Sequence, residues 1–110
     1  MDDALLLHAR SVGDRIRRGD VRGAALVAEL ERVPFVERDA FVDAALATGD
    51  VPDDDVVALP RGAVPYVPCG VDALMHAVRD VPIGARDVFV DYGAGVGRAA
   101  IVVHLLTGAR

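Results

Sequence analysis

Three glycines at alternate positions, Gly93, Gly95 and Gly97, are the residues whose type and spacing most directly suggest chemistry. They lie in the run DVFVDYGAGVGR, where Asp91 stands two residues before the first of them. Glycine lets a chain turn sharply and lets a ligand approach the backbone more closely than a Cβ would permit. The apolar run that follows is expected to be a helix, whose free N–H groups and positive dipole end would face the turn. The pattern therefore predicts a loop that holds a carboxylate or a phosphate.

The residues around the glycines separate the ligand classes that use such a loop. A P-loop requires a Lys followed by Ser or Thr after the last glycine, and this chain has no Lys. The dinucleotide fingerprint G-x-G-x-x-G/A would place its third small residue at position 98, where this chain has Arg98. That fingerprint also requires no acid before the first glycine. A nicotinamide-dependent oxidoreductase is therefore kept only as an alternative.

The run apolar-apolar-Asp-x-Gly-x-Gly-x-Gly resembles motif I of the Rossmann-like (class I) S-adenosylmethionine-dependent methyltransferases. The resemblance implies that the glycines run beside the methionine part and the ribose of S-adenosylmethionine. It also implies that Asp91 supports the loop and the amino group of the cofactor. Arg98 would reach the cofactor's carboxylate with a bidentate fork, or would be an exposed residue without that role. Two further alternatives stay open: Asp91 as a cap without ligand contact, and Gly97 as a site of close helix packing.

The preceding segment, PYVPCGVDALMHAV at residues 65–78, is similar to the cofactor-covering segment of the non-SET histone-lysine methyltransferases (the disruptor-of-telomeric-silencing type). In that group a Tyr, and a small hydroxyl residue three places later, contact the cofactor. The matching residues are Tyr66 and Cys69, and Cys69 departs from the hydroxyl. The resemblance implies cofactor binding, while the histone substrate is not carried over. The alternatives are a loop aromatic for Tyr66 and an inert small apolar residue for Cys69.

The elements that would position these residues begin with an N-terminal helical region at residues 1–49. Apolar residues recur at helical spacing in three stretches, and Gly19 with Asp20 should break the first helix and cap the second, while Gly49 can end the third. The stripes are Leu5, Ala9, Val12 and Ile16, then Leu26, Leu30 and Val33, then Phe41, Ala44 and Ala45. Residues 50–69, rich in Pro and Asp, are expected to be an extended connector.

Residues 70–110 are expected to start a Rossmann-like methyltransferase domain. A helix is predicted over residues 71–81, a strand buried on both faces over 87–92, and an apolar helix over 98–106 that Gly108 ends. The fold class predicted is thus α/β: a helical region followed by the first βα unit of the sheet, truncated and mostly helical as it stands. Because one parallel strand makes no sheet, the chain is expected to be an N-terminal piece of a longer enzyme, inactive alone, or to find its missing partners in another chain. Its exposed apolar helix 98–106 is expected to support self-association.

Composition narrows the class of protein further. The net charge of −5 gives no general attraction to nucleic acid or to an anionic membrane. No apolar run reaches the roughly 18–20 residues of a membrane span, and the acidic start MDDALLLHAR is unlike a secretory signal, so a cytoplasmic protein is expected. All 12 basic residues are Arg, which suggests a GC-rich bacterial genome. One Cys and three scattered His residues predict no metal site.

The sequence thus predicts an S-adenosylmethionine-dependent methyltransferase acting on an unidentified acceptor, with its catalytic residues unknown and expected beyond Arg110. His76 and His104 are expected at helix surfaces or in packing. A hypothesis of a different class is a non-catalytic interaction module. In that case the helices before Gly49 would dock a partner, and the glycine loop would be vestigial.

Overall fold

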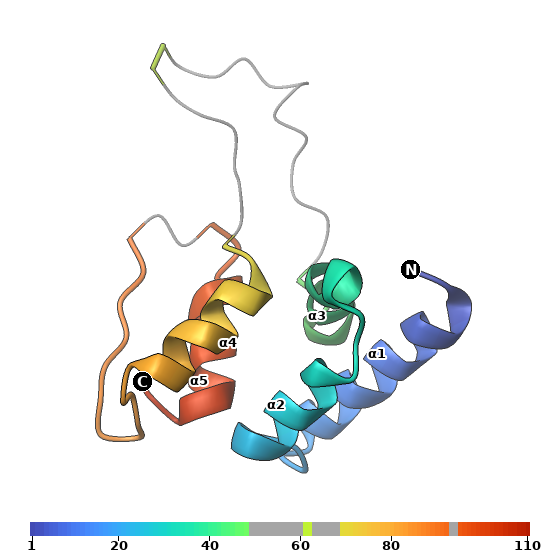
Figure 1. The fold of residues 1–110 in the computed structure, drawn as a ribbon, viewed down its shortest axis with the longest axis horizontal. Coiled ribbons are helices and arrows are strands. Elements are labelled where there is room, and N and C mark those ends of the chain that lie inside the picture. The colour runs from blue at the N-terminus through green and yellow to red at the C-terminus, as the bar shows by residue number, and fades with distance from the viewer. Residues whose placement is uncertain (49–60, 63–68, 93–94) are drawn as a thin grey trace.

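The computed structural model describes residues 1–48, 61–62, 69–92 and 95–110, and within these it is built of helices (Figure 1). The elements in chain order are α1 (Asp3–Arg17), α2 (Gly23–Glu31), the 3-10 helix η1 (Phe35–Glu37), α3 (Arg38–Leu46), α4 (Val71–Asp80) and α5 (Arg98–Thr107). Helix α1 packs on α3, α4 packs on α5, and α2 and α3 join the two pairs by contacting α5 and α4 respectively. No helix in the described ranges has the length and apolar character needed to span a membrane.

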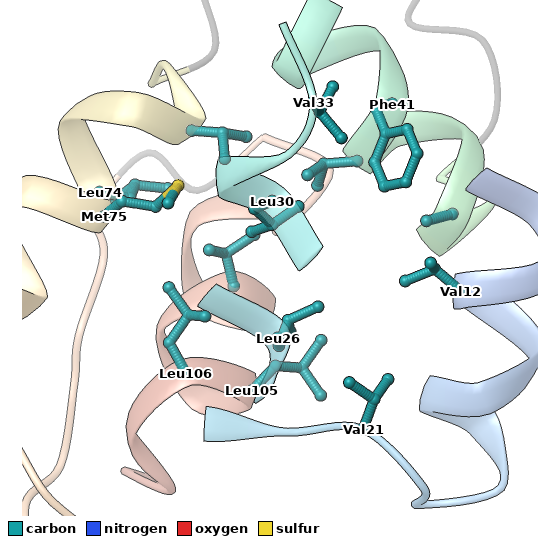
Figure 2. Packing of buried hydrophobic residues seen from close by; sticks show 14 of the residues in the cluster. Val12, Val21, Leu26, Leu30, Val33, Phe41, Leu74, Met75, Leu105 and Leu106 are labelled. Carbon is teal, nitrogen blue, oxygen red and sulfur yellow. The ribbon is translucent and has the colours of Figure 1, made fainter. Parts of the chain in front are cut away.

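The five predicted helices are confirmed, because apolar residues at helical spacing find a common core. Figure 2 shows this core, in which side chains from all five helices meet. Every helix contributes fully buried or nearly buried residues: Ala9, Val12, Leu26, Leu30, Phe41, Val42, Ala45, Val71, Leu74, Met75, Val102, Val103, Leu105 and Leu106. Helices α1, α2 and α3 therefore share one hydrophobic core with helices α4 and α5.

The helix ends follow local capping chemistry only in part. The Asp2 carboxylate accepts a hydrogen bond from the Leu5 amide at 2.7 Å and starts α1, while Gly108 ends α5 as predicted, with a φ of 78°. The predicted cap at Asp20 is wrong, since α2 begins at Gly23 without a side-chain cap. Helix α3 ends at Leu46 with Ala47 as its C-cap, and Gly49 lies outside the described residues.

The predicted α/β fold class is wrong. The described residues contain no strand, and residues 87–92 are not buried on both faces: Val88 is 66% exposed and Val90 65%. Within the described residues the segment has two backbone partners: Gly84, which accepts from the Asp87 amide at 3.0 Å, and Arg110, which accepts from the Phe89 amide at 2.7 Å and donates to the Asp87 carbonyl at 3.0 Å. A doubly buried strand needs neighbours on both edges and layers on both faces. Here the helices pack on one another instead.

The apolar helix at residues 98–106 is not an exposed surface for self-association. In α5, Val102, Val103, Leu105 and Leu106 are buried against α2 and α4, and of its apolar residues Ile101 stands out at 38% exposed. The expectation failed because it assumed a missing sheet as the only cover for this helix. The N-terminal helices supply that cover.

Helices α1 and α3 approach each other most closely at Gly13. A Cβ at position 13 would overlap the carbonyl oxygen of Ala45. Gly13→Ala is therefore expected to lower the free energy of unfolding by about 1–2 kcal/mol, even though Ala favours a helix over Gly by about 1 kcal/mol. Urea unfolding followed by circular dichroism measures the change.

The matched control is Gly84→Ala, where an added Cβ meets no atom of the described residues within 4 Å. Its free energy of unfolding should change by no more than about 0.5 kcal/mol. Equal effects at both positions would contradict the close crossing of α1 and α3.

An ion pair between α1 and α2 makes the stability pH-dependent. Arg15 donates to Glu29 at 2.9 Å, and this hydrogen bond holds the pKa of the Glu29 carboxyl below its usual 4.5, although burial opposes the shift. Because the pKa is lower in the folded state, the stabilisation is present in full above pH 4.5 and is lost as the pH falls through the folded-state pKa. The stability difference between wild type and Glu29→Gln should be constant from about pH 6 to 5 and shrink toward pH 3.

Urea unfolding at each pH measures this difference. The control is Glu31→Gln, an exposed glutamate of the same helix, whose difference from wild type should change less over that range. A Glu29→Gln difference that persists unchanged at pH 3 would rule out the proposed linkage.

Candidate functional site

The glycine loop turns where the sequence predicts a turn. Gly95 and Gly97 have φ values of 58° and 85°, in the left-handed region that favours glycine, and α5 begins at the next residue, Arg98. Gly97 accepts from the Ile101 amide at 3.0 Å, which closes the first helical turn. Gly93 lies outside the described residues.

The N-terminus of α5 carries no side-chain cap. The amides of the first helical residues have no partner within a helix, so they and the positive end of the helix dipole can hold an anionic group. Among the described residues, the only atom within 4 Å of a Cβ added at Gly97 would be Ile101 Cδ1, at 3.9 Å. The geometry is thus that of a glycine turn in front of an uncapped helix.

Arg98 is placed differently from both sequence-based expectations. Its side chain is only 3% exposed, and Nη1 donates to both carboxylate oxygens of Asp43 at 3.1 and 3.2 Å. Nη2 donates to the Cys69 carbonyl at 2.6 Å and lies 3.7 Å from Asp39 Oδ1. Nε is buried without a hydrogen-bond partner in the described part of the chain. The guanidinium therefore anchors α5 on α3, and it is neither exposed nor free to grip a carboxylate of a ligand.

Helix α3 also fixes the N-terminus of α4, through a second carboxylate. Asp39 Oδ1 accepts from the Val71 amide at 2.7 Å, so a carboxylate of α3 caps α4 from a distance. Asp39 and Asp43 are one helical turn apart on α3, and they bring the starts of α4 and α5 together. Sequence analysis missed both residues. The sequence offered one signal for them: Asp39 lies in the first turn of the predicted helix, and Asp43 follows four residues later on the same face.

Of the remaining predicted site residues, Cys69 lies beside the Arg98 guanidinium. Cys69 is exposed, its sulfur lies 3.9 Å from the Gly70 carbonyl, and its own carbonyl is bound to Arg98. Asp91 is half-buried beside Tyr92, which is 95% exposed. Tyr66 lies outside the described residues, so its predicted contact is untested.

A second group of polar side chains lies where α4 faces the start of α3 and the end of α2. Arg38 Nη1 donates to Asp72 at 2.6 Å, and His76 Nε2 lies 3.8 Å from the other oxygen of that carboxylate. They line a hollow of about 430 Å³. Nε of Arg38 also donates to the carbonyls of Leu30 and Val33, so the donors of this guanidinium are used within the protein. We therefore assign this cluster a structural role.

His104 has a packing role as well. Its Nδ1 lies 2.7 Å from the Ala109 carbonyl and fixes the turn after α5. In the described ranges no three His, Cys, Asp or Glu side chains gather as metal ligands.

Replacing Arg98 tests its anchoring role. Arg98→Met keeps much of the volume but removes the bonds to Asp43 and Cys69, so the free energy of unfolding should fall by about 1–3 kcal/mol. The lower half of that range is expected because Asp43 is 45% exposed and can be hydrated when its partner is lost. Chemical denaturation measures the loss.

Arg79→Met is the control, because Arg79 is an exposed arginine whose one ion-pair partner within the described ranges is the exposed Asp80. Its effect should stay within about 0.5 kcal/mol. Arg98→Met with equally small effect would show that the buried guanidinium does not hold the fold together.

No family model matches the chain, and no curated protein or solved structure matches it either.

Proposed function

We propose that the chain binds S-adenosylmethionine at the loop in front of α5 and is part of a methyltransferase that transfers the methyl group to an unidentified acceptor. The observation that supports this best is the left-handed turn at Gly95 and Gly97 directly before an uncapped helix N-terminus. This proposal depends on the loop and the helix, and it requires no sheet.

The residues of the loop suit the two ends of the cofactor's amino acid. Its carboxylate would lie at the free amides of α5, since these point along the positive end of the helix dipole. Its ammonium group would lie at Asp91, which is half-buried at the start of the loop. Gly97 permits the close approach because it has no Cβ, and within the part of the chain that the structure describes only Ile101 Cδ1 lies near the space that a Cβ would occupy.

Acidic groups near the loop also favour a cation. Asp39 and Asp43 contact Arg98, the residue after the last glycine, and their side chains are 56% and 45% exposed. Two carboxylates and one guanidinium leave a net negative charge beside the turn. That charge favours a ligand with a sulfonium centre, although exposure to water weakens the attraction.

Bound S-adenosylmethionine supplies a methyl group on a sulfonium, which a substrate N, O, S or C atom attacks. The chain's own part is to bind and orient, because positioning provides much of the rate in such a transfer. A base is needed only where the acceptor must lose a proton. We assign no such base among the described residues, and we propose a cytoplasmic location.

A second candidate is the non-catalytic helical interaction module. It is favoured by two apolar residues of η1, Phe35 and Val36, which are 66% and 83% exposed. The two candidates differ in one measurable property, since only the first requires cofactor binding.

Calorimetric titration of the chain with S-adenosylmethionine and with S-adenosylhomocysteine should show saturable binding, and NAD(H) should show none. Gly97→Ala should weaken binding at least tenfold, because a Cβ enters the space next to the ligand and strains a φ of 85° by about 1 kcal/mol.

The matched control is Gly19→Ala, because Gly19 has a similar φ of 78° and lies far from the loop in the sequence. A Cβ added there has no neighbour within 4 Å among the residues that the structure describes. This variant should lose similar stability but keep binding. Absence of heat with both sulfur ligands would refute the methyltransferase proposal and leave the interaction module.

A further inference from the structure

The hollow of about 430 Å³ beside Arg38 and Asp72 lies at the junction of α2, α4 and α5. Helix α5 contacts both of the other helices (Figure 1), and its last two residues, Leu106 and Thr107, line the hollow. Small-molecule sites in proteins occupy roughly 300–1,000 Å³. The hollow therefore has the volume of a site for a small ligand.

The apolar lining of the hollow comes from all three helices and from the segment after α4: Val27, Met75, Val78, Ile83 and Leu106. Met75 and Leu106 are buried, and the other three side chains are half-buried. Half-buried apolar side chains around an open volume are a surface that the apolar body of a ligand would remove from water.

The polar lining offers acceptors more than donors. All three nitrogens of Arg38 already donate to Asp72 or to backbone carbonyls of the chain. The Thr107 hydroxyl donates to the Val103 carbonyl at 2.7 Å. The carboxylates of Asp72 and of Glu31, the exposed last residue of α2, also line the hollow. An ionised carboxylate accepts only, with about four lone-pair sites, so these two groups call for a ligand that donates.

The charge of the hollow agrees with this. Its two arginines each have an aspartate beside them, at 2.6 Å for Arg38 and Asp72 and at 3.1 Å for Arg79 and Asp80. Glu31 then leaves one net negative charge. The last turns of α4 and α5 also line the hollow, and the carbonyl end of a helix is the negative end of its dipole. An anionic ligand is therefore disfavoured and a cation is favoured.

We infer that this hollow binds a small organic amine, with its body on the apolar lining and its ammonium group between the carboxylates of Glu31 and Asp72. Arg38 brings these two residues together, because it bonds to the backbone carbonyl of Glu31 and to the carboxylate of Asp72. The inference goes beyond the proposed cofactor site. From Arg98 at that site to Leu106 in the hollow, α5 rises about 12 Å, so the two sites can be tested separately.

Titration with phenethylamine, followed by the amide chemical shifts of the ¹⁵N-labelled chain, tests the inference. At about pH 8 imidazole groups are neutral and the amine is charged. The shifts should saturate with a Kd on the order of 1 mM, as expected for so small a ligand. They should be largest at Met75 and Leu106 and absent at Gly97. Phenethyl alcohol, which lacks the charge, should bind at least threefold more weakly, and the anion hydrocinnamate should not bind.

Two variants test the ammonium and apolar contacts. Glu31→Gln should weaken phenethylamine binding about three- to fivefold, the effect of losing one exposed ion pair. Its control is Asp14→Asn on α1, a 65% exposed carboxylate that should leave binding unchanged. Ile83→Trp should abolish binding because the larger side chain fills the hollow. Its control is Leu7→Trp, at a 65% exposed position on α1.

Circular dichroism checks that each variant keeps its helices, and Glu31→Gln decides the question if Ile83→Trp does not fold. Three results would each overturn the inference. They are shifts that do not saturate with phenethylamine, equal affinity for the amine and for hydrocinnamate, and wild-type binding by Glu31→Gln.

Discussion

The buried guanidinium of Arg98 joins three parts of the chain that are far apart in sequence. It is the first residue of α5, it binds Asp43 of α3 across 55 positions, and it binds the Cys69 carbonyl just before α4 across 29. Removing an arginine side chain from water is costly, and the cost is offset only when its donors are satisfied. Two of its three nitrogens are satisfied here, so the positions of α3, α4 and α5 all depend on this one group.

This arrangement also sets what the glycine loop can do. The buried side chain of Arg98 is hydrogen-bonded to Asp43, and this fixes the start of α5. The turn at Gly95 and Gly97 is therefore attached to a fixed helix start. Binding loops generally work in this way, with an adaptable backbone on a rigid support. The anchor leaves the α5 amides without a side-chain cap, and these are the groups available to a ligand.

The helices could be predicted from the sequence because their apolar residues repeat at helical spacing and each found a partner in the core. Val71, Leu74 and Met75 illustrate this, since all three are buried. The run Val88, Phe89, Val90 could not be assigned in the same way, because a short apolar run does not show whether neighbours exist to cover it. Only Phe89 found cover.

The site was predictable at its local level only. The turn at the glycines is a property of a few adjacent residues, and it lies where the sequence placed it. The pairing of Arg98 with Asp43 is a property of the tertiary structure, which brings together two residues that no local pattern links. The cap that Asp39 gives to α4 was missed for the same reason.

That cap has a consequence for the order in which the chain acquires its structure. Helix α4 has 10 residues and starts at a glycine that offers it no side-chain cap, and a helix of this length is marginal in water on its own. Its first amide is satisfied by a carboxylate 32 positions earlier, so a long loop must close before the helix gains that bond. Docking of α3 and completion of α4 are thus expected to be one cooperative event, with the second helix pair assembling on a template that the first three helices provide.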